Sequence, residues 1–193
     1  RAIFGGRNER RLADDGMVHL RPIKLLILDV DGVMTSGGLP YGQHGNAIKE
    51  FHVQDGGAIR LWQQAGGHVA IISGRQCAAV AVRAAELDIQ LIAQGVGDKL
   101  PVFESFCKEA NVSPAETAFI GDDLLDIAPM RRCGYPIAVA NAVSLVKRAA
   151  TYVTRRAGGS GAIAEAVERL LRRNGTWSSV AGRWSADRAS TDT

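Results

Sequence analysis

The sequence has little of what marks secreted, membrane-spanning or nucleic-acid-binding proteins. Its 193 residues include only three cysteines, Cys77, Cys107 and Cys133, and this odd number lacks the paired C-x-x-C spacing of a zinc site. No apolar run approaches the roughly 20 residues that a membrane-spanning helix needs. The formal net charge is only +3, a weak attraction for nucleic acid. These absences favour free thiols in a reducing cytoplasm, with neither a membrane nor a nucleic acid as partner.

The chain is long enough for one domain with a substantial core, since 46% of its residues are apolar. Its basic residues gather largely at the two ends, where we expect an N-terminal arm over residues 1–22 and a flexible tail over residues 174–193. Residues 23–173 are predicted to form a single domain between them. The basic ends leave a non-catalytic binding protein open as an alternative.

Short apolar runs alternate with segments of helical periodicity along this domain. The runs at 23–30 and 68–72 are nearly all apolar, as in strands buried on both faces of a parallel sheet. Such alternation predicts a doubly wound α/β fold with helices on both faces of the sheet. Two Gly-rich clusters within residues 33–53 predict a projecting β-hairpin. Further strands are expected at 90–93, 117–120, 137–139 and 152–153, and helices at 56–65, 77–87, 99–110, 124–133, 144–149 and 163–172.

Charged and hydroxyl side chains follow the expected strands, at the sheet edge where such folds bind ligands. Asp29 and Asp31 follow the first strand, Ser73 follows the second, and Lys99 opens a helix after the third. Clustered carboxylates repel one another, and Mg²⁺, which prefers oxygen ligands, removes that cost. A hydroxyl and an ammonium suit phosphoryl oxygens, and a carboxylate can act as nucleophile. The cluster after the fourth strand comprises Gly121, Asp122, Asp123 and Asp126.

Each of these motifs alone has a simpler explanation as a turn or a helix cap. Their joint occurrence, each after a predicted strand, favours phosphoryl chemistry. A phosphoreceiver domain uses similar groups, but there the phosphoaccepting Asp follows the third strand and no Gly-Asp-Asp follows the lysine. The order in this chain therefore favours a phosphatase over a receiver.

These elements resemble the haloacid dehalogenase superfamily of phosphotransferases. The resemblance implies that Asp29 is the nucleophile and Asp31 the general acid and base, while Ser73 and Lys99 hold the phosphoryl group. It also implies that Mg²⁺ is bound by the Asp29 carboxylate, the Asp31 backbone carbonyl and Asp122. The motifs that carry the resemblance are Asp29-x-Asp31-Gly32, Ser73, Lys99 and Gly121-Asp122-Asp123-x-x-Asp126, in which Asp123 and Asp126 would support the site.

Many members of this superfamily carry a cap domain, and the spacing here leaves no room for one. Only about 40 residues separate Asp31 from Ser73, and about 20 separate Lys99 from Gly121. The expected hairpin and core elements already fill both intervals. A capless site is wet and unselective, so such members act on macromolecules or cover the site by oligomerising.

A closer resemblance is to the family of 3-deoxy-D-manno-octulosonate 8-phosphate phosphatases, which take part in lipopolysaccharide synthesis. The segments LLILDVDGV, KEFHVQDGGAIR, IISGR, FIGDDLLD and YVTRRAGGSGAI carry it. It implies a small phosphorylated sugar acid as substrate and a homotetramer in which the hairpins pack together. A phosphatase for nine-carbon, sialic-acid-type sugar 9-phosphates shares the scaffold and stays open as an alternative. The implied substrate contacts are Asp31, His52, Val53, Gln54, Asp55, Gly56, Arg60, Arg75, Arg83 and Lys99, with Arg155, Gly158 and Gly159 at the mouth of a neighbouring site.

Overall fold

A computed structural model of the chain describes residues 21–44 and 47–185, with side chains described as far as residue 182. Its centre is a six-stranded sheet in the order β3-β2-β1-β4-β5-β6, and every pair of neighbouring strands is parallel. The predicted doubly wound sheet is confirmed. Its strands are β1 (Leu25–Leu28), β2 (His68–Ile72), β3 (Leu91–Ala93), β4 (Thr117–Gly121), β5 (Tyr135–Ala138) and β6 (Tyr152–Val153).

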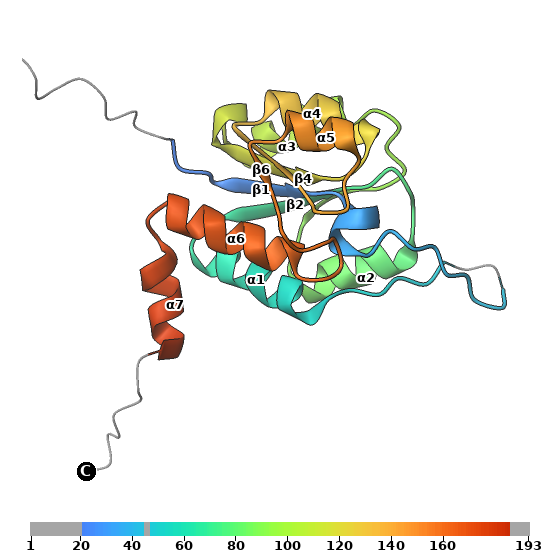
Figure 1. Ribbon diagram of the computed structural model, residues 1–193, viewed down its shortest axis with the longest axis horizontal. Helices are drawn as coiled ribbons and strands as arrows, with labels where there is room; N and C mark the ends of the chain where they lie inside the picture. The colour runs from blue at the N-terminus through green and yellow to red at the C-terminus, as the bar shows by residue number, and fades with distance from the viewer. Residues whose placement is uncertain (1–20, 45–46, 186–193) are drawn as a thin grey trace, which may run out of the picture.

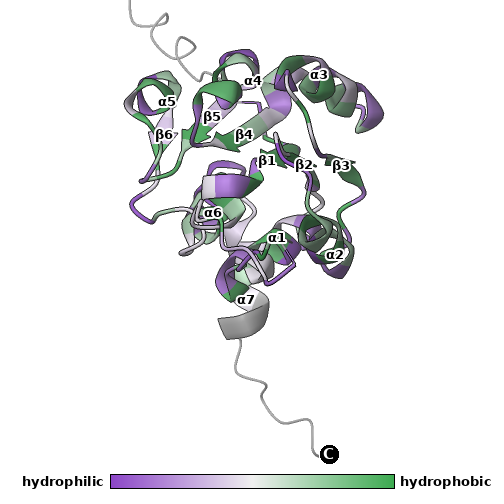
Figure 2. Cartoon of the chain, turned by 90° about the vertical axis from the view of Figure 1, so that its right-hand side faces the viewer, coloured by the Kyte–Doolittle hydropathy of each residue, from purple (hydrophilic) through white to green (hydrophobic). Residues whose placement is uncertain are grey.

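Helices cover both faces of this sheet (Figure 1). One face carries α1, α2 and α6, and the other carries α3, α4 and α5. The strands are largely hydrophobic, whereas hydrophilic residues occur along the helices (Figure 2), as expected when each helix packs one apolar face against a sheet. The helices are α1 (Val53–Gln64), α2 (Ala78–Glu86), α3 (Lys99–Glu109), α4 (Ile127–Arg132), α5 (Ser144–Ala149) and α6 (Ala162–Arg173).

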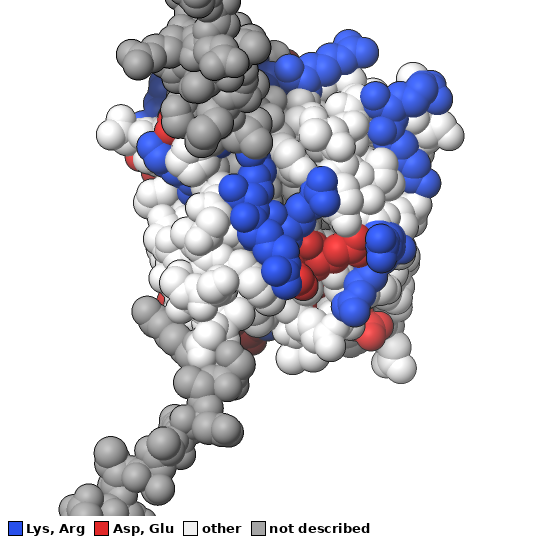
Figure 3. Space-filling model, turned by 60° about the vertical axis from the view of Figure 1, so that its left-hand side comes forward, with Lys and Arg blue, Asp and Glu red and all other residues white. Residues whose placement is uncertain are grey.

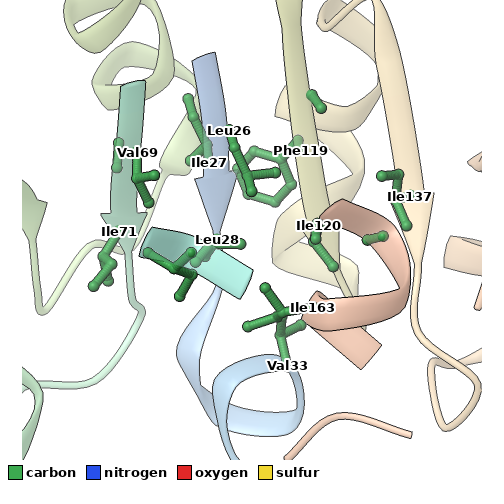
Figure 4. Packing of buried hydrophobic residues seen from close by; sticks show 14 of the residues in the cluster. Leu26, Ile27, Leu28, Val33, Val69, Ile71, Phe119, Ile120, Ile137 and Ile163 are labelled. Carbon is green, nitrogen blue, oxygen red and sulfur yellow. The ribbon is translucent and has the colours of Figure 1, made fainter. Parts of the chain in front are cut away.

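The core is centred on β1, which lies between β2 and β4 and is buried along its whole length. Figure 4 shows apolar side chains of these strands meeting Val33 and Ile163, which come from the turn after β1 and from α6. In register, Leu28 lies beside Ile71 of β2 and Ile120 of β4. The three strands therefore end almost level with one another.

The chain leaves neighbouring strands toward opposite faces at this level. β1 leads to α1 on one face, and β4 leads to α4 on the other. Diverging connections of this kind open a crevice at the carboxyl ends of the strands, where doubly wound folds bind ligands. The residues that follow β1, β2 and β4 are Asp29, Ser73 and Asp122, so the topology brings the predicted groups to one edge.

The segment between β1 and α1 differs from the regular hairpin that we expected. After a compact turn, Val30–Met34, the chain projects from the domain (Figure 1). In its described part, one isolated antiparallel bridge pairs Tyr41 with Ala47, and Ile48 N donates to Pro40 O at 2.9 Å. Its many glycines provide few cross-strand side-chain pairs, which regular strands need. Residues 45 and 46 lie outside the described residues.

The C-terminal part also differs from expectation, because helix α7 (Trp177–Ser185) occupies much of the predicted flexible tail. The Arg172 guanidinium lies 4.7 Å from the centre of the Trp177 ring, and Val180 is buried against the core. These two contacts, about one turn apart, give the described part of the helix a packed face. Residues 1–20, most of the predicted arm, lie outside the described residues. None of the helices in the described ranges is both long and apolar enough to cross a bilayer.

Candidate active site

Three of the predicted polar residues form a buried charged cluster at the carboxyl edge of the sheet. Asp29 follows β1, Lys99 begins α3, and Asp126 lies between β4 and α4. The Lys99 ammonium donates to Asp29 Oδ1 at 2.5 Å and to Asp126 Oδ1 at 2.7 Å. All three are at most 5% exposed. A buried charge is tolerated when it is paired, and here one lysine serves two carboxylates.

The loop after β4 is folded around the second oxygen of Asp126. The backbone N–H groups of Asp122 and Asp123 donate to Asp126 Oδ2 at 2.9 and 3.1 Å. Asp123 turns its own carboxylate to the backbone N–H of Leu124, at 2.7 Å. Asp126 therefore holds both Lys99 and the loop that presents Asp122, while Asp123 caps the short turn that follows.

The surroundings shift the pKa values of these groups strongly. Burial, then the neighbouring charge of Asp126, raises the pKa of Asp29 to about 6, although Lys99 opposes the rise. Burial, followed by repulsion from Asp29 and Asp126, raises the pKa of Asp122 to about 8. Burial alone lowers the pKa of Lys99, but attraction to Asp29 and Asp126 outweighs it, so that pKa is raised. The site thus concentrates more negative charge than Lys99 neutralises.

This excess of negative charge fits a divalent cation. Asp29, Asp122 and Asp126 each offer an oxygen atom, and these atoms lie within 4.8 Å of one another. Asp122 Oδ1 is buried without a hydrogen-bond partner in the described ranges, whereas both oxygens of Asp126 are engaged. Hard oxygen ligands with net negative charge suit Mg²⁺. Asp29 and Asp122 are thus the side chains best placed to bind a cation, with Asp126 behind them.

Asp31 and Gly32 form the turn that follows Asp29. The Lys49 ammonium donates to Asp31 Oδ1, and Asp31 Oδ2 is buried without a partner among the described residues. Gly32 has φ of +99°, and a Cβ there would lie 2.0 Å from Asp122 Oδ2. Only glycine adopts this backbone geometry without strain and leaves room for Asp122. Asn141 donates from Nδ2 to the Gly32 carbonyl at 3.1 Å.

A glycine loop between β6 and α6 closes on the same turn. Gly158 N donates to Asn141 Oδ1 at 2.7 Å, and Gly159 N donates to Val33 O at 3.0 Å. A Cβ on Gly158 would lie 1.7 Å from the Gly32 carbonyl oxygen. We expected Gly158 and Gly159 at the mouth of a neighbouring site, and within this chain they pack against the turn of its own site.

Ser73 follows β2, the strand that pairs with β1, and so lies at the same edge of the sheet as the acidic cluster. It is 1% exposed, and its hydroxyl accepts the backbone N–H of Arg75 at 3.3 Å. The Arg75 side chain reaches the projecting segment, where Nη2 donates to the Tyr41 hydroxyl at 3.2 Å. Ser73 therefore retains its hydroxyl hydrogen for a ligand, and Arg75 lies at the more exposed rim.

A broad groove of about 1100 Å³ lies elsewhere, along the β6 edge of the sheet and α6. Several of its charged side chains have polar or aromatic partners within the chain: Arg169 donates to the Tyr135 hydroxyl and stacks on Tyr152, while Glu165 accepts from the Tyr152 hydroxyl and from the backbone N–H of Arg155. Figure 3 shows a face on which basic and acidic side chains are interspersed. The groove is lined by none of the acidic cluster, so the candidate site is the crevice at the strand ends.

Comparisons with known proteins agree with this geometry. The model of the haloacid dehalogenase-like hydrolases matches residues 89–167. The 3-deoxy-D-manno-octulosonate 8-phosphate phosphatase of Escherichia coli is 40% identical over 169 residues, which cover 88% of this chain and 90% of that protein. The Haemophilus influenzae phosphatase of the same name is 40% identical over 156 residues, 81% of this chain and 87% of that one.

The chain belongs to the 3-deoxy-D-manno-octulosonate 8-phosphate phosphatase family.

Solved structures of this phosphatase family superpose closely on the chain. The Moraxella catarrhalis enzyme, in complex with a magnesium ion, a phosphate ion and a KDO molecule, has a TM-score of 0.82 at 35% identity, covering 86% of this chain and 95% of that one. The cobalt-bound Haemophilus influenzae enzyme has a TM-score of 0.79 at 40% identity, covering 82% and 93%. The chain is accordingly a phosphatase of the haloacid dehalogenase type, as its motifs predicted.

The predicted substrate contacts of this phosphatase lie mostly along the first turn of α1. His52 precedes the helix and Val53 is 80% exposed, whereas Gln54 accepts from Arg156 Nη1 at 3.1 Å. Asp55 is 3% exposed, and its carboxylate accepts the backbone N–H groups of Gly161 and Ala164 at 3.2 and 2.8 Å. In this structure Asp55 therefore joins α1 to the beginning of α6.

The predicted arginines divide between the rim and the helix surfaces. Arg83 packs against the backbone of Gly56 and lies 5.8 Å from the Phe51 ring centre, close to the first turn of α1. Arg60 pairs with Asp88 at 2.9 Å and with the Glu86 carbonyl, at the end of α2. The structure thus engages the Arg60 guanidinium within its own chain, away from the acidic cluster.

Sequence reasoning passed over Lys49 and Asn141. Lys49 contacts Asp31 across 18 positions, and Asn141 contacts Gly32 across 109 positions. Lys49 begins the segment KEFHVQDGGAIR, but neither that motif nor any periodicity indicates a contact with Asp31, and no motif marks an asparagine after a strand. Only the folded arrangement shows that both hold the turn that follows β1.

Proposed function

We propose that this phosphatase hydrolyses 3-deoxy-D-manno-octulosonate 8-phosphate to the free sugar acid and phosphate, in the synthesis of lipopolysaccharide precursors. The observation that carries the proposal is the Asp29–Lys99–Asp126 cluster with Asp122 beside it, at the carboxyl edge of a sheet that matches enzymes of this name. The free thiols of Cys77, Cys107 and Cys133 agree with action in a reducing cytoplasm.

In the first step, Asp29 Oδ attacks phosphorus while the bond from phosphorus to the sugar oxygen breaks, which gives an aspartyl-phosphate and the free sugar. Asp31 supplies the proton that the departing oxygen needs. In the second step, Asp31 takes a proton from water, which attacks phosphorus and releases phosphate and the Asp29 carboxylate. Lys99 and the Ser73 hydroxyl hold phosphoryl oxygens throughout.

Mg²⁺ would be held by the Asp29 and Asp122 carboxylates with the Asp31 backbone carbonyl, and when bound it supplies positive charge for the phosphoryl group. Asp126 orients Lys99 and the backbone N–H groups of Asp122 and Asp123. Asp123 caps the adjoining turn. These assignments agree with the raised pKa of Asp122, because a cation offsets the crowding of the carboxylates.

The sugar end would lie over the first turn of α1 and the rim arginines. His52, Val53, Gln54 and Gly56 belong to that turn or directly precede it, Arg83 lies against Gly56, and Arg75 reaches Tyr41 of the projecting segment. Arginine grips carboxylates bidentately, which suits the acid group of the substrate.

The decisive experiment measures Mg²⁺-dependent phosphate release from 3-deoxy-D-manno-octulosonate 8-phosphate and from a nine-carbon sialic-acid-type sugar 9-phosphate. The Asp29→Asn variant is the blank. We expect a large kcat/KM advantage for the eight-carbon sugar, abolished in the variant. Preference for the nine-carbon sugar would retain the mechanism and replace the substrate. Equal release by variant and wild type would refute the assignment of the nucleophile.

We further propose a homotetramer that covers the capless site. Apolar side chains are exposed on the projecting segment and along the carboxyl edge, and such exposed apolar residues mark interaction surfaces. We expect light scattering to give four chains for the wild type and fewer for a Tyr41→Asp/Ile48→Asp variant. Val82→Asp, at an exposed position of α2, is the matched control that stays tetrameric. The exposed residues concerned are Leu39, Tyr41, Ile48, Val53, Leu124 and Leu125.

A further inference from the structure

Lys49 has a buried side chain, and its ammonium is paired with Asp31. It lies on the returning limb of the projecting segment, shortly before α1. Its side chain is 3% exposed, and its ammonium donates to Asp31 Oδ1. No other hydrogen bond or ion pair of this ammonium occurs within residues 21–44 and 47–185. Removing an ammonium from water is costly unless a partner compensates it, so the burial of the Lys49 side chain depends on the Asp31 carboxylate.

The contact leaves the two oxygens of Asp31 in different environments. Lys49 occupies Oδ1, while Oδ2 is buried and has no hydrogen-bond partner among the described residues. A carboxylate held at one oxygen has a fixed orientation for the other. General acid catalysis requires the proton donor within hydrogen-bond reach of the leaving group, so this orientation matters to the reaction.

The two lysines of the crevice serve different carboxylates. Lys99 bridges Asp29 and Asp126, from the beginning of α3. Lys49 lies on the projecting segment, ahead of α1, and among the described residues it pairs with Asp31 alone. The nucleophile and the group that acts on the leaving oxygen are therefore positioned by separate cations on separate elements.

We propose that Lys49 is a positioning residue for Asp31, which it orients so that Oδ2 faces the departing oxygen. The proposal rests on the proposed function, in which Asp31 is the general acid and base. As Asp29 Oδ bonds to phosphorus and the bond to the sugar oxygen breaks, the proton moves from Asp31 Oδ2 to that oxygen. Lys49 keeps its own protons and exchanges none.

The role predicts a dependence on the leaving group. A sugar alcohol is a poor leaving group and needs the proton from Asp31, whereas 4-nitrophenolate leaves without one. In Lys49→Met, we expect kcat for the sugar 8-phosphate to fall about 10- to 100-fold, part of the roughly 10² to 10⁴ that general acid catalysis contributes. We expect kcat for 4-nitrophenyl phosphate to change less than about threefold, and both KM values to stay similar.

Two further variants and a control make the test decisive. Asp31→Asn should separate the two substrates in the same way, and Lys49→Arg, which keeps a positive charge, should recover at least tenfold of the loss in Lys49→Met. Lys24→Met is the matched control, because Lys24 pairs with Glu116 at the opposite end of β1. It should leave both rates unchanged.

The outcomes distinguish this proposal from the proposed function beneath it. If Asp31→Asn lowers both substrates equally, the assignment of Asp31 as general acid fails, and the role of Lys49 fails with it. If Asp31→Asn separates the substrates and Lys49→Met lowers both equally, Lys49 only anchors the projecting segment. If Lys49→Met does not fold, Lys49→Arg carries the test. A ratio of the two kcat values like that of wild type would support orientation of Asp31 by a positive charge at position 49. Equal losses of kcat on both substrates would overturn the proposal.

Discussion

The two ends of the sheet differ in how completely their polar groups are paired. At the amino end, the Asn174 side chain accepts from Ile23 N and donates to Ile23 O, at 3.0 and 2.7 Å. Lys24 pairs with Glu116 at 2.6 Å, and the Trp62 indole N–H donates to His68 O at 2.9 Å. Most polar groups there have a hydrogen-bond or ion-pair partner, although Arg173 Nε, near Arg21, is buried without one among the described residues.

At the carboxyl end, more of the buried polar atoms lack a partner. Within the described residues, Asp31 Oδ2, Asp122 Oδ1 and His52 Nδ1 are buried without a hydrogen bond. Unsatisfied buried polar groups are costly and rare. The amino end thus stabilises the fold, and the carboxyl end retains unpaired groups that a cation and a substrate can engage.

The largest expected effect that would test this comparison is a loss of activity without a loss of stability when Asp29 is replaced. Asp29→Asn should lower kcat by roughly 10³-fold or more, because the nucleophile is lost. The melting temperature should stay within a few degrees, since burial already disfavours the charged form of Asp29. Phosphate release and thermal unfolding measure the two quantities. A large fall in stability would show that this end also holds the fold together.

The next effect concerns Mg²⁺ and pH. The pKa of Asp122 is about 8 in the folded chain and ordinarily 3.8. The folded state therefore binds the proton more tightly, and metal-free protein should become less stable as pH rises from about 4 to 8. Mg²⁺ at about 100 times its Kd should add about 2.7 kcal/mol at pH 8, and less at pH 5, where protons compete.

Calorimetry with a chelator and with Mg²⁺ at a series of pH values measures this effect. Asp122→Asn is the control, and it should flatten the pH dependence of the metal-free protein. A metal-free protein that instead gains stability between pH 5 and 8 would contradict the repulsion among these carboxylates.

A smaller effect comes from two asparagines that perform the same task at opposite ends. Asn174→Ala should cost about 2 kcal/mol of unfolding free energy, because two hydrogen bonds to Ile23 are lost, and should leave kcat unchanged. Asn141→Ala removes bonds to Gly32 and Gly158, so it should cost a similar free energy and also lower kcat. Urea unfolding and phosphate release on both variants would show whether the two ends differ.

The smallest effect is the acid sensitivity of the amino end. Lys24, followed by Ser113, lowers the pKa of Glu116 to about 2 from an ordinary 4.5. A lowered pKa stabilises the fold fully above pH 4.5, and this contribution is lost as pH falls toward 2. Glu116→Gln should therefore lose less stability than wild type over that window, with unchanged activity at neutral pH. Identical acid unfolding curves for Glu116→Gln and wild type would show that the Lys24–Glu116 pair does not contribute to stability.

The sequence predicted the sheet well because each central strand is a short apolar run that is buried on both faces, as in residues 25–28 and 68–72. It also predicted Asp29, Ser73, Lys99 and Asp122 as neighbours, since parallel strands end at one edge. It was least informative about the projecting segment, whose glycines carry no periodicity, and about α7, in whose described part Trp177 and Val180 pack against the core.

The site residues that eluded the sequence are those defined by distant partners. Asp55 lies in the segment that resembles the family's substrate contacts, yet its carboxylate is bound by Gly161 and Ala164, more than 100 positions away. Lys49 begins a segment that resembles the family, yet only the fold places it against Asp31. Pattern shows which strand a side chain follows, whereas its partner depends on packing that no local pattern encodes.

The contact of Gly158 with the Gly32 carbonyl has a consequence for protein engineering. Because a Cβ at position 158 would overlap that carbonyl at 1.7 Å, a saturation library there should return glycine almost alone. The exposed rim at Arg75 and Val53 carries no such constraint. Libraries that aim at new sugar phosphates should therefore vary the rim and keep the glycine loop fixed, so that substrate selectivity can change while the catalytic residues keep their positions.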